Sequence, residues 1–342
     1  MKDLITLSRP VNLLIIAATM VVMREGVVGG YLERGLGQLL IEDGHGFTRS
    51  ELVLPEGFGP QLPIHLFILL VLSTVLIAAA GNIINDYFDT RIDRINKPGE
   101  VIVGRTVKRR VAMTTHVVLS GIGLVLGTFV AWRSGQLKWA LIPAFAIGAL
   151  WSYSTYYKRQ LIIGNGLVAT LTALVPLTVG LYEIPALQRW LSDPPIITMP
   201  NGEQYLMEAS VRELWYFILI YTAFAFVSTL VRELQKDMAD VRGDEAEGCH
   251  TVPIVWGMKW ARGMTMAYIG LLIIGLLAIR MYLLRDPFSY WYIGIGVIGA
   301  LLLSAGFTYQ AQQRSEHVRA GQLMKLAMVL AIGFAVFIRT LP

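Results

Sequence analysis

The stretch LFILLVLSTVLIAAAGNIINDYFDTRID, residues 66–93, decides the fold, because a long apolar run in it ends directly in a row of polar and acidic side chains. Residues 66–84 carry no charge and approach the roughly 20 apolar residues that a membrane-spanning helix needs. The side chains that follow are Asn85, Asp86, Asp89 and Asp93. At about 100° per residue, all four share one face of a helix. Carboxylates at a membrane boundary are costly unless something compensates them, so this face indicates a functional site.

A second acidic cluster follows another apolar segment, residues 215–230. Its members are Asp237, Asp240 and Asp244, which by the same arithmetic lie within about 60° of arc. Two carboxylate faces on two membrane helices predict sites for divalent cations, and cations placed there would hold a polyanion. Mg²⁺ suits this role because it binds one or two carboxylates together with phosphate oxygens. The pattern therefore predicts a diphosphate that bridges two Mg²⁺ ions, with nearby Lys and Arg side chains neutralising the remaining charge of the leaving group.

The composition indicates a polytopic membrane protein. The 342-residue chain is 55% hydrophobic and 15% charged, and its mean hydropathy is +0.57. We expect an all-α fold with nine transmembrane helices, which cover residues 11–30, 64–86, 111–132, 138–157, 161–183, 213–234, 262–284, 288–308 and 321–340. These helices leave no soluble domain of useful size, so residues 1–342 are expected to form one membrane domain.

Several residue types argue against other kinds of site. The single cysteine, Cys249, excludes an internal disulfide and a cysteine-rich metal site. The five histidines have no ligand-like spacing, which argues against a histidine metal site. The first apolar segment resembles a signal peptide, but Arg24 and Glu25 follow it without a convincing cleavage pattern, so we expect a retained first helix.

The distribution of positive charge predicts the orientation. With a cytoplasmic amino terminus, about two thirds of the 29 Lys and Arg residues fall on the cytoplasmic side, as the positive-inside rule favours. Both acidic clusters then open toward the cytoplasm. We therefore expect an integral protein of an inner or plasma membrane, with its amino terminus and its active-site opening in the cytoplasm.

Two long segments are expected on the outer side. Residues 31–62 mix Gly, Pro and Glu with scattered Leu, and they predict a short interfacial helix over about residues 32–41. Residues 184–211 contain Asn201-Gly202 between two short apolar runs, which predicts a small hairpin.

Three further polar residues lie at the ends of predicted helices. Asn12 is at the start of the first, and Tyr153 and Lys158 are at the end of the fourth. An interfacial Tyr is commonly part of the aromatic belt, and an interfacial Lys commonly extends to the headgroups. An Asn at a helix start commonly caps that helix or bonds to a neighbouring one. Residue type alone leaves both the structural and the functional interpretations open.

Taken together, these motifs resemble the UbiA superfamily of intramembrane prenyltransferases. The resemblance rests on Asn85-Asp86-x-x-Asp89-x-x-x-Asp93 with Asn96-Lys97-Pro98, and on Asp237-x-x-Asp240-x-x-x-Asp244. Supporting pieces are Arg9-Pro10-x-Asn12, Tyr153-Ser154 with Lys158, and Gly243-Asp244 before Thr251-Val252-Pro253. The resemblance spans nearly the whole chain. It implies a helical bundle around a central cavity that opens laterally to lipid, with two Mg²⁺ ions as cofactors at the cytoplasmic end.

The resemblance also assigns roles to residues. The side chains that would bind Mg²⁺ and diphosphate are Asn85, Asp86, Asp89, Asp93, Asp237, Asp240 and Asp244. The substrate-binding candidates are Asn12, Asn85, Arg94, Arg105 and Lys236. The residues expected to carry catalysis are Asp86, Asp89, Asp237, Tyr153 and Lys158. In this scheme Lys158 contacts the diphosphate, and Tyr153 steadies the diphosphate or the allylic cation with its hydroxyl or its ring.

Within the superfamily, residues 79–89 and Arg232-Glu233-Leu234-x-Lys236-Asp237 are most similar to the digeranylgeranylglyceryl phosphate synthase branch. That similarity implies Mg²⁺-dependent transfer of a geranylgeranyl group from an allylic diphosphate to a lipophilic acceptor in the membrane, geranylgeranylglyceryl phosphate. Many members continue Pro98 with an Arg-Pro-containing segment, whereas this chain reads Gly99-Glu100-Val101, so the acceptor stays open.

Other functions remain as alternatives at this point. The nearest is the same chemistry with an aromatic acceptor of menaquinone, ubiquinone or tetrapyrrole synthesis. A transporter also carries acids within a membrane, but usually near the midplane. A soluble chain-lengthening prenyl synthase shares Asp-rich motifs, but nine spans exclude it. The expected partners are a prenyl diphosphate, a lipophilic acceptor and membrane lipids, and no pattern indicates nucleic acid or an obligate protein partner.

Overall fold

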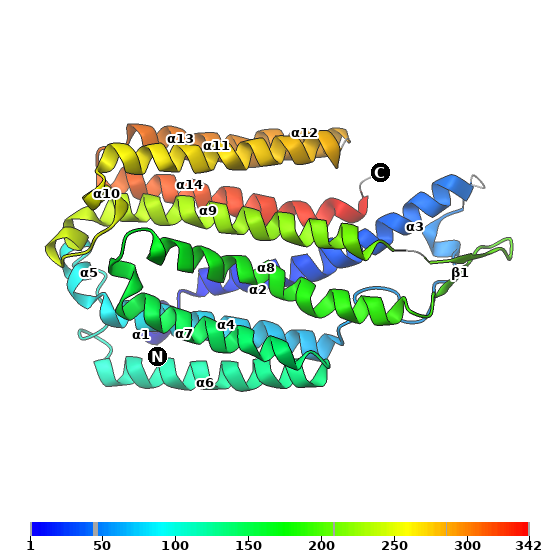
Figure 1. Cartoon of the computed structure of the whole chain (residues 1–342), viewed down its shortest axis with the longest axis horizontal. Coiled ribbons are helices and arrows are strands. Elements are labelled where there is room, and N and C mark those ends of the chain that lie inside the picture. The colour runs from blue at the N-terminus through cyan, green and yellow to red at the C-terminus, as the bar shows by residue number, and fades with distance from the viewer. Residues whose placement is uncertain (1, 44–46, 208, 285, 341–342) are drawn as a thin grey trace.

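The computed structural model describes residues 2–43, 47–207, 209–284 and 286–340, and most of them are helical. Long helices run side by side along the length of the molecule (Figure 1). Within these ranges, eight helical segments are long and apolar enough to cross a membrane, namely Pro10–Leu40, Ile64–Phe88, Arg109–Arg133, Ile163–Trp190, Val211–Ala246, Met258–Tyr282, Pro287–Gln310 and Arg314–Ile338. The prediction of an all-α membrane protein is therefore confirmed.

The expected helix that is missing from these eight spans, the fourth in the chain, is present but short. The expected span 138–157 forms a 3₁₀ turn, η3 (Leu137–Ala140), followed by α7 (Leu141–Thr155). The 15 residues of α7 fall short of the roughly 20 that a full crossing needs. Because α7 packs against α4 and α8, it nevertheless belongs to the same bundle.

The first span differs from the prediction. After a short α1 (Lys2–Leu7), α2 (Pro10–Val22) continues through a π-helical segment, η1 (Met23–Gly29), into α3 (Gly30–Asp43) without a break. The prediction of a separate interfacial helix near residues 32–41 is wrong, because this stretch continues the helix of the first span. Leu32 and Leu36 are buried in the main hydrophobic core, and their burial keeps the chain helical beyond residue 30.

The remaining elements follow the apolar segments of the sequence closely. In chain order they are η2 (Arg49–Glu51), α4 (Ile64–Phe88), α5 (Thr90–Asn96), α6 (Arg109–Arg133), η4 (Tyr157–Arg159), α8 (Ile163–Trp190), β1 (Ile196–Thr198), β2 (Gln204–Leu206), α9 (Val211–Ala246), α10 (Val252–Val255), α11 (Met258–Tyr282), α12 (Pro287–Trp291), η5 (Tyr292–Ile298), α13 (Gly299–Gln310), α14 (Arg314–Phe334) and η6 (Ala335–Thr340). The longest, α9, carries the second acidic cluster on its last turns, so that cluster lies on a continuous helix rather than in a loop.

Small residues let neighbouring helices approach closely, as is common in membrane bundles. α4 and α6 form one such pair. A Cβ on Gly123 of α6 would lie only 2.6 Å from the side chain of Ile77 on α4. Ser73 of α4 donates a hydrogen bond of 2.6 Å to the carbonyl oxygen of Gly123. The close approach thus also satisfies a hydroxyl that apolar surroundings would otherwise leave unpaired.

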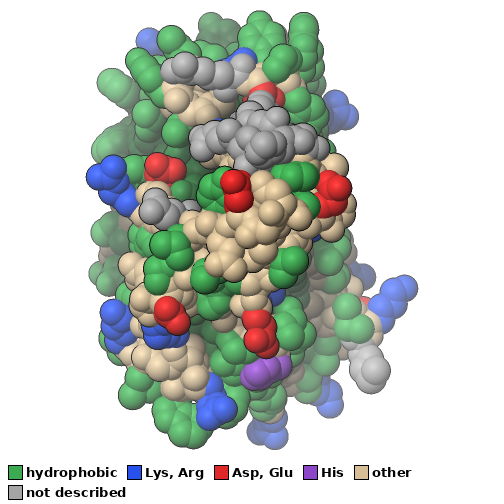
Figure 2. Space-filling model, turned by 90° about the vertical axis from the view of Figure 1, so that its right-hand side faces the viewer, with side chains coloured by type: hydrophobic (Ala, Val, Ile, Leu, Met, Phe, Trp, Pro, Cys, Tyr) green, Lys and Arg blue, Asp and Glu red, His purple; other side chains and the backbone are tan. Residues whose placement is uncertain are grey.

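The hairpin end of the molecule is the end that carries β1 and β2. The two strands pair antiparallel, with Ile196 opposite Leu206, and the turn contains Gly202 at a φ of 89°. The predicted hairpin is confirmed. Figure 2 looks onto this end and shows charged side chains of both signs scattered among hydrophobic and polar ones. Below the hairpin, Arg24 of η1 donates to Glu183 of α8 at 2.7 Å, and both side chains are buried.

The carboxylate end of the molecule is the opposite end, which carries α5, α10 and the last turns of α9 (Figure 1). α5 packs directly against α9 there. The two acidic clusters, although about 150 residues apart in the chain, therefore meet at one end of the bundle.

Candidate active site

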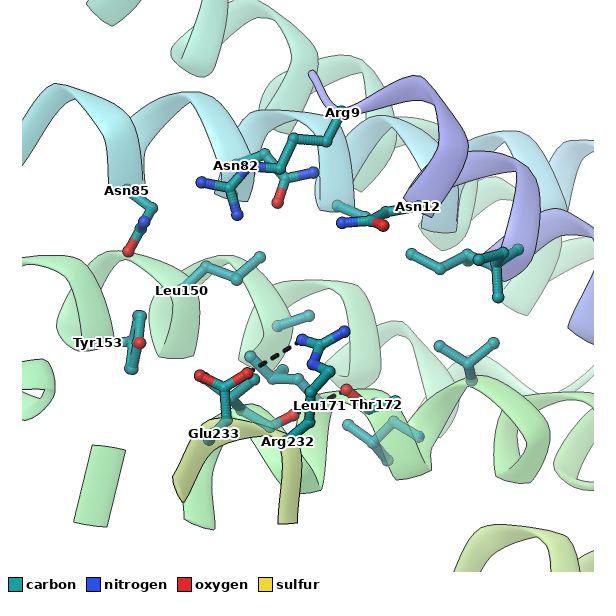
Figure 3. Close-up of a pocket in the computed structure, with 18 of the residues that line it drawn as sticks. Arg9, Asn12, Asn82, Asn85, Leu150, Tyr153, Leu171, Thr172, Arg232 and Glu233 are labelled. Carbon is teal, nitrogen blue, oxygen red and sulfur yellow. Dashed lines mark hydrogen bonds and ion pairs between the residues drawn. The ribbon is translucent and has the colours of Figure 1, made fainter. Parts of the chain in front are cut away.

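A cavity of about 570 Å³ runs into the bundle from the carboxylate end. The helices around it are α2, α4, α7, α8, α9 and α14. The walls from α4, α7 and α8 are largely apolar and include Ile77, Leu150 and Leu171. The walls from α2, α9 and α14 carry most of the charged side chains. Figure 3 shows Arg9, Asn82 and Asn12 facing Arg232 and Thr172 across this space.

The first acidic cluster surrounds the junction of α4 and α5, and each of its carboxylates has a cationic partner. Asn85 Nδ2 donates to Asp89 Oδ2 at 2.7 Å, and Lys158 of η4 forms an ion pair with the same oxygen. Arg9, just before α2, donates to Asp86 Oδ1 at 2.5 Å. These contacts join three separate segments around one carboxylate face.

The third carboxylate of this cluster, Asp93, lies one helical turn further along. Its Oδ1 is 3.3 Å from Lys97 Nζ, and Lys97 lines the cavity. The cluster is therefore electrically balanced at rest.

The second acidic cluster uses a mixture of neutral and charged partners. Asn165 of α8 donates to Asp237 Oδ2 at 2.8 Å. Arg314, at the start of α14, has its Nε 3.5 Å from Asp240 Oδ1. Asp244 is buried at 4% exposure. α9 thus presents these carboxylates to the tips of α8 and α14 at the carboxylate end.

Asn96 fastens the two clusters together. Its Nδ2 donates to the carbonyl oxygen of Asp240 at 3.0 Å, and its Oδ1 accepts from the backbone N–H of Gly243 at 2.9 Å. A Cβ at position 243 would lie 2.5 Å from Asn96 Nδ2, so only glycine leaves room for this contact. The last residue of α5 is thereby fixed between Asp240 and Asp244 of α9.

Backbone in the left-handed region occurs at one cation of the first cluster and close to another. Arg9 has a φ of 56°, in the left-handed region that non-glycine residues rarely adopt. Ile162, the residue just before α8 and four residues after Lys158, has a φ of 65°. Such conformations cost of order 1–3 kcal/mol each and concentrate at functional sites. The two strained positions thus lie at Arg9 and four residues after Lys158, and both of these cations pair with carboxylates of the first cluster.

The charge states at this end follow from the pairing. Burial alone would raise the pKa of the Asp89 carboxyl, but Lys158 and Lys236 outweigh burial and hold that pKa below its ordinary value. Burial would lower the pKa of Lys158, but Asp89 outweighs it and raises that pKa. Asp93 behaves differently, because burial raises its pKa. At neutral pH, Asp89 is a carboxylate and Lys158 is an ammonium ion.

Comparison with known proteins identifies this architecture. A model described as the UbiA prenyltransferase family matches residues 57–329, which is most of the chain. The chain belongs to the UbiA prenyltransferase family. It is therefore an enzyme that transfers prenyl groups, and it is an integral membrane protein.

The sequences of individual relatives align with this UbiA family member over most of their length. The digeranylgeranylglyceryl phosphate synthase of Methanothermobacter thermautotrophicus is 29% identical over 278 residues, which cover 79% of this chain and 84% of that protein. The enzyme of the same name from Natronomonas pharaonis is 30% identical over 241 residues, which cover 70% of this chain and 74% of that protein.

Solved structures share the fold of the UbiA family member described here. A UbiA homolog from Aeropyrum pernix K1 has a TM-score of 0.56 and 16% identity, over 93% of this chain and 98% of that one. A UbiA homolog from Archaeoglobus fulgidus bound to GPP and Mg²⁺ has a TM-score of 0.55 and 14% identity, over 98% of this chain and 99% of that one.

Most of the site residues predicted from the sequence meet in this structure. Asn12, Asn85, Tyr153, Lys236 and Asp240 line the cavity of the UbiA bundle. Tyr153 is only 8% exposed, so it faces the interior rather than a headgroup belt. Asp86, Asp89, Asp93, Asp237 and Asp244 lie at the carboxylate end of the same bundle. Arg94 and Arg105 are instead exposed and are not among the cavity-lining residues.

Sequence reasoning missed several cavity residues. Arg9 appeared only as part of a motif, although it pairs with Asp86. Arg232, Glu233, Arg314, His317 and Lys325 also line the cavity. A signal was available for Lys325, because it is an ionisable residue within the apolar segment 321–340, and such residues in a membrane mark functional sites. Arg232 and Glu233 offered the same signal, because both are ionisable residues within the expected span 213–234.

The donor set suits Mg²⁺. Among the described residues, no group of three or more His, Cys, Asp or Glu side chains converges to hold an ion by itself. Mg²⁺ does not need such a cage, since it is bound through one or two carboxylates with phosphate oxygens and waters. Within the described ranges, Asn85 Oδ1 is buried without a hydrogen-bond partner. Asp240 Oδ1 also lacks a hydrogen bond there, and its ion pair with Arg314 is long, at 3.5 Å. Each of the two faces thus has one buried oxygen that is not hydrogen-bonded.

Proposed function

We propose that this chain transfers a geranylgeranyl group from geranylgeranyl diphosphate to a hydroxyl of geranylgeranylglyceryl phosphate, in a reaction that requires Mg²⁺. The observation that carries the proposal is that Asn96 joins the two carboxylate faces at the mouth of a membrane cavity. That cavity has one apolar side and one cationic side. Relatives 28–30% identical over most of the chain are named digeranylgeranylglyceryl phosphate synthase, which supports this acceptor.

The donor site is assigned to the carboxylate end. Asn85, Asp86, Asp89 and Asp93 on one face, and Asp237, Asp240 and Asp244 on the other, would hold the metal ions. When bound, Mg²⁺ supplies positive charge to the diphosphate and so makes it a better leaving group. Lys158, Lys236 and Arg9 stand beside these carboxylates and would contact the diphosphate oxygens directly.

The prenyl chain is assigned to the apolar side of the cavity. Ile77, Leu150 and Leu171 come from three different helices and line one continuous wall. A buried apolar wall excludes water, which would otherwise capture the allylic cation. Tyr153 lies on α7, three residues beyond Leu150, and its ring can face the allylic carbon as the positive charge develops.

The bond changes of the transfer are simple. A hydroxyl oxygen of the acceptor bonds to C1 of the allylic group, and the bond from C1 to the diphosphate oxygen breaks. The diphosphate leaves with the electron pair, and the hydroxyl proton passes to a diphosphate oxygen. Lys158 and Arg9 contribute by stabilising the negative charge that collects on the leaving group, which is where preorganised charge accelerates a reaction most.

The carboxylate end is assigned to the cytoplasmic side of the membrane. The basic residues that follow α4 and α9 cluster at this end, and the positive-inside rule places such loops in the cytoplasm. A cytoplasmic opening also gives a water-soluble diphosphate headgroup access to the metal site. Cysteine labelling from each side of right-side-out vesicles, with a new cysteine at exposed Glu100, tests this orientation.

The decisive experiment measures lipid products. Purified protein in vesicles is given labelled geranylgeranyl diphosphate, Mg²⁺ and either geranylgeranylglyceryl phosphate or an aromatic quinone precursor. We expect product with the glyceryl phosphate lipid, none after chelation, and recovery on adding Mg²⁺ back. Asp86→Ala and Asp237→Ala should lose activity and stay folded, whereas Asp193→Ala, exposed in the loop before β1, serves as the control. Transfer to the aromatic precursor alone would refute the acceptor, and full turnover by both variants would refute the metal site.

A further inference from the structure

Lys325 is a positive charge inside a membrane span without an acidic partner. It lies on α14, roughly 16 Å along the helix axis from Arg314 at 1.5 Å per residue, and it lines the cavity. Its Nζ donates to Asn12 Oδ1 at 2.6 Å. The ion pairs found among the described residues do not include it. The neutral amide of Asn12 does not compensate the positive charge of Lys325. An uncompensated charge within a membrane span indicates a functional site, here one for an anionic ligand.

Arg232 adds a second positive charge to the same region. Its side chain lines the same cavity as Lys325. Its Nη2 lies 3.0 Å from Glu233 Oε1, but Glu233 also faces Lys236, whose Nζ is 4.0 Å away. One carboxylate therefore serves two cations. The guanidinium of Arg232 extends into the cavity toward the side that Asn12 occupies (Figure 3).

The wall around these two cations is polar and incompletely hydrogen-bonded. His317, only 2% exposed, has no hydrogen-bond partner at either ring nitrogen in the described part of the chain. Gln235 is fully buried, and its Oε1 also has no partner. His317 and Lys325 are eight residues apart on α14 and share one face with Gly321 between them. Buried polar atoms without partners are costly, which indicates a polar ligand in this part of the cavity.

The charge balance of the cavity favours an anion. Its cationic lining residues are Arg9, Lys97, Arg232, Lys236, Arg314 and Lys325. Its acidic lining residues are Glu233 and Asp240. Arg9, Lys97 and Arg314 are already paired with carboxylates of the donor site. Three cations remain, Arg232, Lys236 and Lys325, against one further acidic lining residue, Glu233. Lys236 is assigned to the diphosphate, so the excess positive charge deeper in the cavity lies at Arg232 and Lys325.

This pair lies deeper in the bundle than the carboxylates. Arg232 precedes Asp237 by five residues on α9, which corresponds to about 7.5 Å along the helix axis. An anion bound at Arg232 and Lys325 is thus separated from a diphosphate at the carboxylate end. In the proposed reaction, the reacting carbon and the acceptor hydroxyl would lie between these two anion sites.

We propose that Lys325 and Arg232, with Asn12 orienting the lysine, form the subsite that binds the phosphate group of the acceptor lipid. This inference rests on the proposed function and adds a second anion site to it, distinct from the diphosphate site. The polar wall of α2, α9 and α14 then holds the acceptor headgroup, while the apolar wall of α4, α7 and α8 holds the prenyl donor. The phosphate itself takes no part in bond making.

The test compares acceptors that differ only in the phosphate. Wild-type protein and Lys325→Gln are assayed with geranylgeranylglyceryl phosphate and with its dephosphorylated alcohol. Loss of a charge-assisted hydrogen bond predicts that the variant raises KM for the phosphorylated acceptor by roughly tenfold or more, with a much smaller change in KM for the diphosphate donor. The preference of the enzyme for the phosphorylated acceptor over the alcohol should fall by the same factor. Lys325→Arg should recover part of it.

Controls separate this inference from the proposed function and from misfolding. Lys259→Gln, exposed on α11, should keep the wild-type acceptor preference. Wild-type protein that transfers to neither glyceryl acceptor refutes the proposed function itself. Wild-type protein that uses the phosphorylated acceptor, together with a Lys325→Gln variant of unchanged KM and preference, refutes the subsite alone.

The source of the bound phosphate is settled by two further measurements. Glycerol 1-phosphate should inhibit competitively against the acceptor, and Lys325→Gln should weaken this inhibition. Vesicles of purely zwitterionic lipid should support the same acceptor KM as vesicles with added phosphatidylglycerol. Inhibition by phosphatidylglycerol that Lys325→Gln abolishes would assign the pair to a membrane lipid and overturn the acceptor assignment.

Discussion

Replacement of Gly243 by alanine should lower prenyl transfer strongly while it leaves the bundle folded. The added Cβ would lie 2.5 Å from Nδ2 and 2.8 Å from Oδ1 of Asn96, so the amide must move. That movement breaks the hydrogen bonds from Asn96 to the Asp240 carbonyl and from the Gly243 N–H to Asn96. These two bonds are what join α5, with the first acidic cluster, to α9, with the second.

The size of the effect follows from the two lost bonds. A hydrogen bond contributes about 0.5–1.5 kcal/mol net, so the joined arrangement loses about 1–3 kcal/mol relative to the separated one. Because 1.4 kcal/mol corresponds to a factor of about ten, we expect kcat/KM to fall roughly 5- to 150-fold. Alanine in place of a helical glycine gains about 1 kcal/mol of helix propensity, so global stability should change little.

The assay combines labelled-product kinetics in vesicles with thermal unfolding in detergent. Gly263→Ala on α11, where a Cβ meets nothing within 4 Å, is the matched control and should keep wild-type activity. Asn96→Ala should cause a similar loss, and in that background Gly243→Ala should have almost no further effect, because the clash is gone. Independent, additive losses in the double variant, or a Gly243→Ala enzyme of full activity, would refute the idea that Asn96 joins the two clusters.

Three further predictions concern other parts of the molecule. Glu183→Ala should lower the free energy of unfolding by about 3–5 kcal/mol, because Arg24 and the N–H groups of Gln61 and Leu62 lose their acceptor. Thermal unfolding should therefore show a lower Tm, and an unchanged Tm would contradict this. Gly164→Ala, whose Cβ would lie 2.7 Å from the Tyr157 carbonyl, should displace the turn that carries Lys158 and lower kcat/KM about tenfold, whereas Gly166→Ala, in open space, should not. Burial raises the pKa of the Cys249 thiol to about 11, so iodoacetamide at pH 8 should label the unfolded chain and spare the folded one; equal labelling rates would disprove it.

The sequence predicted the helices well because lipid makes their signal simple. Every backbone polar group in a span must be satisfied within its own segment, so a long apolar run has little alternative to a helix. The first span shows where this reasoning stops. Residues 31–43 are mixed in character, and their helical continuation depends on burial of Leu32 and Leu36 against partners distant in sequence. No local pattern could show that contact.

The acidic faces could be predicted because their residues are close together in the sequence. Their cationic partners could not be predicted, because they come from distant segments. Helical spacing predicts the relative directions of Asp86, Asp89 and Asp93, because the backbone stays helical in conformation from α4 through Asp89 into α5. The partners of these acids come from elsewhere: Arg9 from the segment before α2, and Lys158 from the turn before α8. Arg94 and Arg105 were close in sequence to the acids, yet their segment turns them to solvent. Proximity in the chain was a poor guide to proximity in space.

The paired charges at the carboxylate end also explain how an acid-rich site can accept a polyanion. At rest, Asp86 and Asp89 neutralise Arg9 and Lys158, so the membrane boundary carries little net charge there. If a magnesium diphosphate binds as proposed, these carboxylates would hold the metal and the two cations would face the phosphate oxygens. Each carboxylate would then exchange a cationic side chain for Mg²⁺, and each cation would exchange a carboxylate for a phosphate oxygen. No charge would be left buried without a partner, which is the costly outcome in a low-dielectric site. In the proposed donor site, the resting ion pairs would therefore keep both the carboxylates and the cations charged and in place until the substrate arrives.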